Sequence, residues 1–179
     1  MSEMQNSPFE LLAQISAAGA RNALPLPNED ALADDWRGIG FRLAGQIYVA
    51  PMSEVDEVLT LPTYTKVPGV KHWLNGVANI RGRLLSVVDL GAMLGNKTCV
   101  TSAKTRVLAI RKDDLYSGVI VDEVLGLQTF SSHDQFEEKV ENSDSESFFT
   151  GGFEKDGQLW TVFSLHQLVD TAEFLSVTA

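Results

Sequence analysis

Two stretches of this sequence occur twice in the same order, and this repetition constrains the fold more than any single motif does. The pentapeptide VDEVL occupies residues 55–59 and again residues 121–125. The segment GRLLSVVDLGAML, residues 82–94, aligns with GQLWTVFSLHQLV, residues 157–169, with the first glycine and several apolar positions in register. Common apolar residues can match by chance, but two blocks in one order favour a duplicated unit, over about residues 39–94 and 105–170.

A duplicated unit of this size is expected to pack against its copy. A unit of about 60 residues buries too little surface to be very stable alone, and the whole chain has 179 residues. Short alternating apolar segments outnumber long helical patterns, which indicates a mainly β protein with about five strands in each unit. We therefore expect two small units packed together and not two separate domains.

Hairpins are expected where glycine or aspartate separates two apolar strands. Gly82 and Gly157 are predicted to be equivalent turn glycines, because a two-residue hairpin turn needs positive φ, and Gly76 is also assigned to a structural turn. The spacing of Ser53 and Asp56 is that of a capping box and predicts a short helix from Ser53. The expected strands are residues 39–43 and 46–50, 77–80 and 83–88, 106–110 and 116–121, and 159–163, before a final helix over Leu165–Phe174.

The first 35 residues differ from the rest and are predicted to be an N-terminal extension. A helix is expected over Pro8–Ala20, followed by an acidic linker over residues 23–35. The helix either docks onto a partner or closes the core, through an apolar stripe of Phe9, Leu12 and Ile15.

Charge is unevenly distributed over the chain. The net charge is −10, yet residues 66–112 carry nine basic side chains and one acid. An acidic protein is repelled by nucleic acid, whereas a basic middle region can steer a protein partner; the alternative is a solvated surface that keeps the protein soluble. The main domain is expected over residues 36–175, and its acidic stretch 132–146 is expected to end in an exposed loop.

No catalytic, cofactor or metal site is expected. Cys99 is the single cysteine, which excludes an internal disulfide and a cysteine-based metal site. The histidines lack metal-ligand spacing, and they are His72, His133 and His166. Residues 91–98 match a phosphate-binding loop only loosely. The single cysteine, with no secretory signal and no membrane-spanning apolar run, predicts a cytosolic protein.

One segment of the chain resembles a known signature. LNGVANIRG, residues 74–82, followed by LSVVDL, residues 85–90, resembles the hairpin of the CheW-like chemotaxis adaptors. A later Val-Asp-x-Val segment is matched by residues 121–124, and a Phe-Thr-Gly strand, residues 149–151, precedes a final apolar strand. The resemblance covers residues 36 to about 169, with the motifs in the expected order.

This resemblance implies a fold of two packed five-stranded SH3-like barrels that share an apolar core, with a few short helices. It implies a non-enzymatic adaptor that links the cytoplasmic tip of a membrane chemoreceptor to a CheA-like histidine kinase and self-associates in arrays. It also implies no nucleic-acid partner and no membrane insertion. The receptor tip would lie between the barrels, at positions that match Val55, Glu57, Val58, Asn79 and Arg81.

Several assignments stay open at this point. Val121 and Val124, in the second pentapeptide, are either core or partner-binding, and Arg81 is either solvated or an interface residue with a rigid fork. Ser86 stands where the family commonly has proline. The N-terminal extension resembles that of adaptors in the chemotaxis-like system that drives type IV pilus twitching motility. The alternative function is a ligand- or oligonucleotide-binding barrel pair, which would need exposed aromatic side chains and a basic groove.

Overall fold

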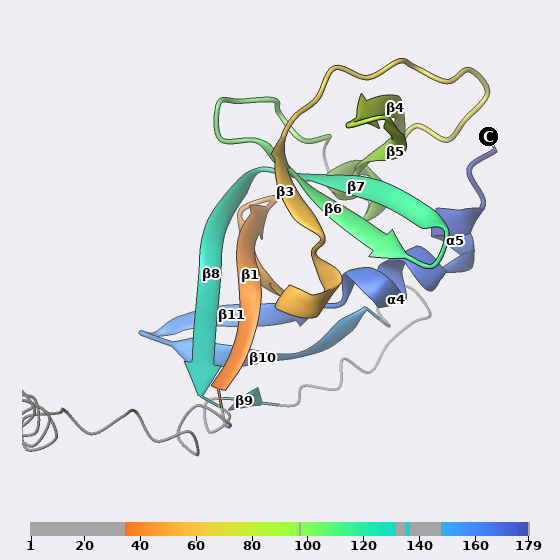
Figure 1. Ribbon diagram of the computed structural model, residues 1–179. Helices are drawn as coiled ribbons and strands as arrows, with labels where there is room; N and C mark the ends of the chain where they lie inside the picture. The colour runs from red at the N-terminus through yellow and green to blue at the C-terminus, as the bar shows by residue number, and fades with distance from the viewer. Residues whose placement is uncertain (1–34, 97, 132–134, 137–147, 179) are drawn as a thin grey trace, which may run out of the picture. The chain divides into compact units, whose positions relative to one another are not determined.

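The computed structural model describes residues 35–178 apart from 97, 132–134 and 137–147, and these residues form two β-sheets with short helices (Figure 1). The strands are β1 (Asp35–Leu43), β2 (Gln46–Pro51), β3 (Glu57–Thr60), β4 (Leu74–Ile80), β5 (Arg83–Asp89), β6 (Arg106–Lys112), β7 (Leu115–Val121), β8 (Glu123–Ser131), β9 (Gln135–Phe136), β10 (Phe149–Lys155) and β11 (Gln158–Phe163). The helical segments are the 3-10 turn η1 (Met52–Glu54) and the helices α3 (Leu90–Met93), α4 (Leu165–Asp170) and α5 (Ala172–Leu175). The mainly β fold with few short helices is confirmed. The predicted N-terminal helix and the loop at residues 140–147 lie outside the described residues.

Each sheet combines strands from both sequence repeats. Sheet A has the strand order β8-β1-β2-β11-β10-β9, and sheet B has the order β3-β6-β7-β5-β4. The repeats align β1 to β5 with β6, β7, β8, β10 and β11, so equivalent strands take equivalent places, and β9 is an addition to sheet A. The first two strands of each repeat thus pair with the last three of the other. One repeat does not form one sheet, and the repeats cannot separate without breaking the strand pairing.

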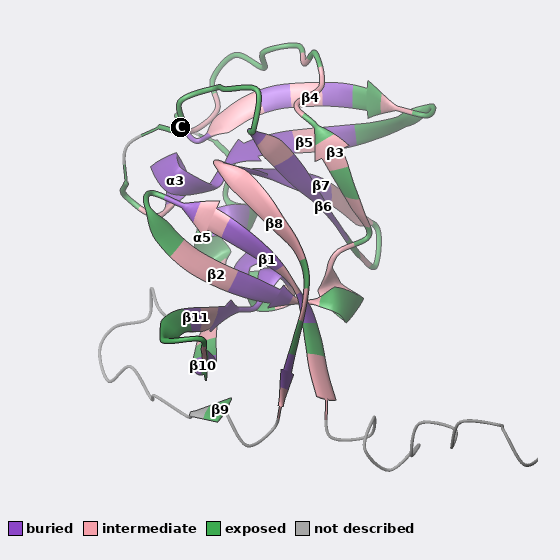
Figure 2. Ribbon diagram, turned by 90° about the vertical axis from the view of Figure 1, so that its left-hand side faces the viewer, coloured by how far each residue is buried: buried purple, intermediate pink, exposed green. Residues whose placement is uncertain are grey.

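Both sheets contain buried stretches, drawn in purple in Figure 2, and the buried apolar residues form three clusters. The largest combines Phe41 and Phe163 of sheet A with Leu108 and Ile110 of sheet B, and α4 contributes Leu168. A second cluster belongs to sheet B, with Ala78, Leu85, Val87, Val107, Ala109 and Ile120; a third belongs to sheet A, with Val49, Phe130, Phe153, Trp160 and Val162. Each sheet therefore has its own small core, and the two share the largest one.

Tight turns with left-handed backbone connect the hairpins. In the β4–β5 turn, φ is 51° at Arg81 and 84° at Gly82; in the β10–β11 turn, it is 54° at Asp156 and 71° at Gly157. Positive φ at both central residues matches the right-handed twist of the flanking strands. The two glycines therefore occupy equivalent turns of the duplicated hairpin.

Three local expectations differ from the structure. Ser53 does not begin a helix, because Met52–Glu54 form one 3-10 turn whose N-cap is Pro51, without a side-chain cap. The final helix is interrupted at Thr171, which has extended backbone and caps α5 by accepting a hydrogen bond from the Phe174 amide. Gly76 lies inside β4, at a shift of register with β5, and not at a turn.

Candidate functional site

Glu57 and Arg81 form a bidentate ion pair that joins the two edge strands of sheet B. Arg81 Nη2 lies 2.6 Å from Glu57 Oε1, and Nη1 lies 3.2 Å from Oε2. Glu57 begins β3 and Arg81 follows β4, and these strands stand at opposite edges of the sheet. The sheet thus curls until its edges meet, and the Arg81 side chain remains 78% exposed. Two of the predicted site residues are therefore in direct contact.

Three other predicted residues lie on the strands that carry this ion pair or lead into them. Asn79 Oδ1 accepts a hydrogen bond of 2.8 Å from the Gly82 amide, which holds the turn that carries Arg81. Val58 is 40% exposed and offers apolar surface next to Glu57 on β3. Val55 is half-buried against the shared core and fixes the start of this segment. The ion pair thus links the first pentapeptide to the β4–β5 turn, while Val58 is exposed on the other face of β3.

The valines of the second pentapeptide, Val121 and Val124, are more buried than those of the first. Val121 ends β7 and is fully buried in the shared core, on the same face of the strand as Val119. This corrects the assignment of Val121 to a partner-binding surface, because its side chain has no exposed area. Val124 is half-buried against the same cluster, and its part in partner binding stays a prediction.

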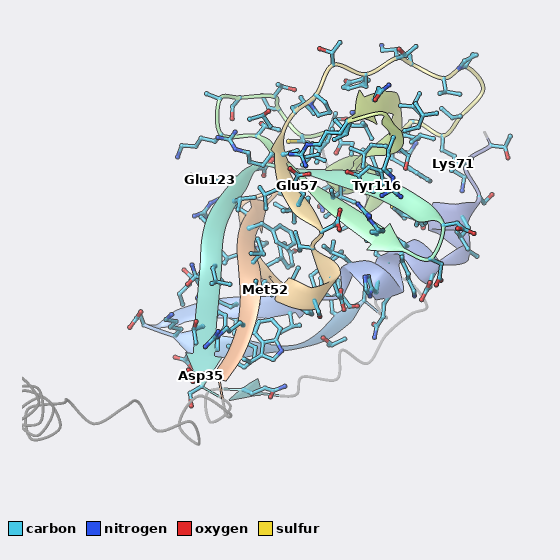
Figure 3. The ribbon with its side chains drawn as sticks, in the orientation of Figure 1. Asp35, Met52, Glu57, Lys71, Tyr116 and Glu123 are labelled. Atoms are coloured by element: carbon cyan, nitrogen blue, oxygen red, sulfur yellow. The ribbon has the colours of Figure 1, made fainter. Side chains whose placement is uncertain are left out.

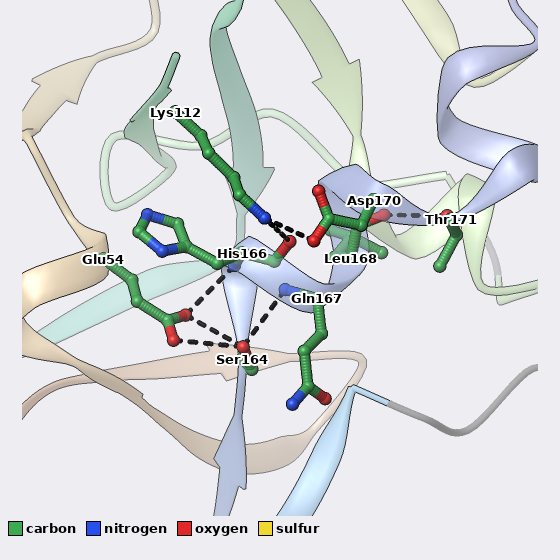
Figure 4. A network of polar contacts seen from close by, with 8 residues as sticks. All are labelled: Glu54, Lys112, Ser164, His166, Gln167, Leu168, Asp170 and Thr171. Atoms are coloured by element: carbon green, nitrogen blue, oxygen red, sulfur yellow. Dashed lines mark hydrogen bonds and ion pairs between the residues drawn. The ribbon is translucent and has the colours of Figure 1, made fainter.

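A polar network anchors the segment that leads into β3 (Figure 4). The Glu54 carboxylate of η1 accepts hydrogen bonds from Ser164 Oγ at 3.0 and 3.2 Å and from the His166 amide at 3.1 Å. Ser164 Oγ in turn accepts from the Gln167 amide, and therefore caps α4. Glu54 places its negative charge at the N-terminal end of α4, where free amide donors favour it. Sequence reasoning missed Glu54, because its partners lie 110 and 112 residues away in the chain.

The second pentapeptide has different ionic partners from the first. Glu123 Oε1 lies 3.0 Å from Lys104 Nζ, and Glu123 Oε2 lies 3.7 Å from Arg42 Nε. The hydrogen bond from Lys104 lowers the pKa of Glu123. The turn residue equivalent to Arg81 is Asp156, which cannot pair with a glutamate at neutral pH. Figure 3 labels both Glu57 and Glu123. The duplication is therefore symmetric in backbone but not in charge.

A cavity of about 540 Å³ lies beside the second pentapeptide. It is lined by Leu43, Ala44, Asn96, Thr98, Cys99, Val100, Ser102 and Asp122. Cys99 Sγ donates a hydrogen bond to Asp122 Oδ1 at 3.1 Å, and the Cys99 amide donates to the buried Asp89. Burial, followed by the hydrogen bond to Asp122, raises the pKa of Cys99 to about 12. The thiol stays protonated at neutral pH and is a poor nucleophile.

We expect the folded protein to resist alkylation at Cys99. At pH 8 the reaction with iodoacetamide should be at least about 100-fold slower than in urea-unfolded protein, because the thiolate is the reactive form. Asp122→Asn should speed the reaction, since the aspartate raises the pKa of Cys99. The raised pKa of Cys99 also makes stability depend on pH, because the thiol of the unfolded chain ionises near its ordinary pKa whereas the folded one keeps its proton up to about pH 12. The free energy of unfolding should therefore fall as pH rises from about 9 towards 12. Equal rates in folded and unfolded protein would contradict the prediction.

The described part of the chain holds no arrangement typical of a metal or stacking site. Among these residues there is no group of three or more histidine, cysteine, aspartate or glutamate side chains able to hold a metal ion. The large apolar side chains in the exposed class there include no aromatic one. In the same residues, no helix has the length and hydropathy needed to cross a bilayer.

Comparison with known proteins identifies the family. The CheW-like domain matches residues 37–173, which include every described strand but the first two residues of β1. The chain belongs to the CheW-like family. CheW-like proteins are non-enzymatic scaffold adaptors, and this protein is accordingly no enzyme.

Relatives and a solved structure agree with this assignment. The chain is 44% identical to Protein PilI of Pseudomonas aeruginosa over 179 residues, covering 99% of each chain. It is 27% identical to chemotaxis protein CheW of Helicobacter pylori over 124 residues, 69% of this chain and 70% of the other. The scaffolding protein TtCheW of Thermoanaerobacter tengcongensis superimposes with a TM-score of 0.68 at 22% identity, covering 77% of this chain and 94% of that one. This last likeness concerns the fold alone.

Proposed function

We propose that this CheW-like protein couples the cytoplasmic tip of a membrane chemoreceptor to a CheA-like histidine kinase. The observation that carries the proposal is the exposed bidentate ion pair of Glu57 and Arg81, which joins the first pentapeptide to the β4–β5 turn. Val58, the next residue of β3, is 40% exposed on the other face of the strand. Arginine, with its rigid fork and apolar stem, is typical of protein interfaces. The scaffold character of the family supports a binding role.

The pathway we propose is the chemotaxis-like system that controls type IV pili and twitching motility. The support is the 44% identity to PilI over 99% of both chains, which includes the N-terminal extension outside the CheW-like domain. CheW proteins match only 69% of the chain in the Helicobacter case. The protein would act in the cytoplasm, recruited to receptor arrays at the membrane and associating there with other copies.

Arg81→Ala should separate binding from folding. We expect binding of the full-length protein to a purified chemoreceptor cytoplasmic tip to weaken about 10-fold, as for other interface arginines. The free energy of unfolding should fall by no more than about 1 kcal/mol, because exposed ion pairs contribute little. Titration calorimetry and urea unfolding measure the two quantities.

Arg37→Ala is the matched control, since Arg37 is an exposed arginine on β1 of sheet A. It should change neither quantity. A large loss of stability with binding intact would make Arg81 a structural residue. Failure of the wild-type protein to bind either the receptor tip or the kinase would overturn the proposed function.

A further inference from the structure

The interior face of sheet B ends, at one edge of the molecule, in charged side chains. Residues two apart on a strand share a face. Leu85 and Val87 belong to the apolar cluster of sheet B, so Arg83, which begins β5, continues their face outward. The same alternation puts Arg111 of β6, Tyr116 of β7 and Glu57 of β3 on the strand face that carries this cluster. We name the set the arginine rim, and it comprises Asp56, Glu57, Arg81, Arg83, Arg111 and Tyr116.

Contacts within the arginine rim hold its groups in place. The Tyr116 ring lies between two guanidinium groups, with Arg83 Cζ at 5.1 Å and Arg111 Cζ at 5.3 Å from its centroid. Arg111 Nη2 lies 2.8 Å from Asp56 Oδ2, and this ion pair fixes the far side of the stack. Glu57 and Tyr116 are labelled in Figure 3. Stacking on an aromatic face orders a guanidinium while its N–H edge stays free to donate.

Arg83 differs from the other two arginines of the rim. Arg81 pairs with Glu57 and Arg111 pairs with Asp56, whereas no carboxylate in the described part of the chain pairs with Arg83. The rim therefore has three guanidinium groups and two carboxylates. The guanidinium of Arg83 is exposed and presents a planar fork of donors, whose best complement is a carboxylate bound through both oxygens.

The duplicated half of the molecule shows that the fold itself does not require this cluster. The aligned repeats place Gln158 at the position of Arg83. The strand pairing of sheet A then places Ile47 where sheet B has Tyr116, while an arginine is kept beside it: Arg42 pairs with Ile47 as Arg111 pairs with Tyr116. Sheet A forms the same strand order without the stack. The stack of Arg83 on Tyr116 is thus a feature of one half only, which indicates a role in recognition and not in folding.

We propose that Arg83 binds a carboxylate of the receptor tip, an aspartate or glutamate side chain that docks beside the Glu57–Arg81 pair. The inference rests on the proposed function and adds to it the chemistry of the receptor segment. Tyr116 and Arg111 act as positioning residues, because they hold the Arg83 guanidinium ready for a bidentate contact. Preorganised donors of this kind lose less conformational entropy when they bind.

The test uses the full-length protein and a purified chemoreceptor cytoplasmic tip from the same organism, in titration calorimetry at low and at physiological salt. Arg83→Ala should weaken binding about 10-fold and Arg83→Glu about 100-fold, since the second variant adds repulsion. Both should reduce the salt dependence of binding. Arg83→Lys keeps the charge but loses the fork, and should fall between wild type and Arg83→Ala. Arg37→Ala should bind as wild type does.

The possible results distinguish a failure of this inference from a failure of the proposed function. Wild-type affinity in the Arg83 variants, with weakened binding in Arg81→Ala, would overturn this inference and leave the proposed function intact. A loss of kinase binding without a loss of receptor binding would also overturn it. Absence of receptor binding by the wild-type protein would instead refute the proposed function. Thermal unfolding of each variant distinguishes binding defects from misfolding, and Arg83→Lys serves as the test if Arg83→Glu does not fold.

Discussion

Gly76→Ala should destabilise the protein by about 3 kcal/mol or more, which is large for a single methyl group. Gly76 has φ of +150°, a backbone conformation that residues with a Cβ rarely adopt. An added Cβ would stand 2.2 Å from the carbonyl oxygen of Thr65 and 3.1 Å from Lys66 Cα. The Thr65 backbone cannot retreat freely, because it exchanges two hydrogen bonds of 2.8 and 2.9 Å with Val77. Urea unfolding of wild type and variant measures the loss.

Gly82→Ala is the matched control for this substitution. Gly82 also has positive φ, at 84°, but beyond its chain neighbours no atom lies within 4 Å of the place that an added methyl group would take, so only the backbone strain remains. We expect a cost of about 1 kcal/mol there. Equal costs at the two glycines would show that the contact with Thr65 is unimportant.

Phe163→Ala should reduce the free energy of unfolding by about 3–5 kcal/mol, as expected for a large buried aromatic side chain. Phe163 is fully buried, and its ring centroid lies 4.9 to 6.0 Å from those of four other aromatic rings, which belong to Phe41, Tyr48, Phe148 and Phe149. It belongs to the cluster that also contains Leu108 and Ile110 of sheet B. Loss of this ring should therefore accelerate amide hydrogen exchange in both sheets together.

Two further variants make this experiment decisive. Leu159→Ala, on the same strand, removes a side chain that is 49% exposed and should have a small effect. Phe163→Leu leaves a smaller void and should cost about 1 kcal/mol, so it remains measurable if the alanine variant does not fold. Faster exchange confined to β11 and its neighbours, with β6 unchanged, would show that the two sheets unfold independently.

The candidate site was only partly predictable, because its ionic contacts join distant segments. The hairpin signature pointed to Arg81 and Asn79, and the repeated pentapeptide pointed to Glu57 and Val58. No local pattern predicts the ion pair between Glu57 and Arg81, because it depends on the curl of sheet B. The alternation from Val87 through Leu85 to Arg83 could have indicated a charged end to an interior strand face. That Arg111 and Tyr116 lie near Arg83 depends on the strand order of sheet B.

The sequence by itself determined the local elements, because hairpin turns and strand faces depend on neighbouring residues. The turns at Gly82 and Gly157, the alternating strands and the order of elements in each repeat follow from glycine conformation and apolar periodicity. The tertiary structure alone decided that the repeats exchange strands. Equivalent strands of the two repeats can pair either within one repeat or with the other repeat, and only packing selects between the two arrangements. The tertiary structure also decided the burial of Val121, which the matching Val55 does not share, since equivalent sequences meet different neighbours in each half.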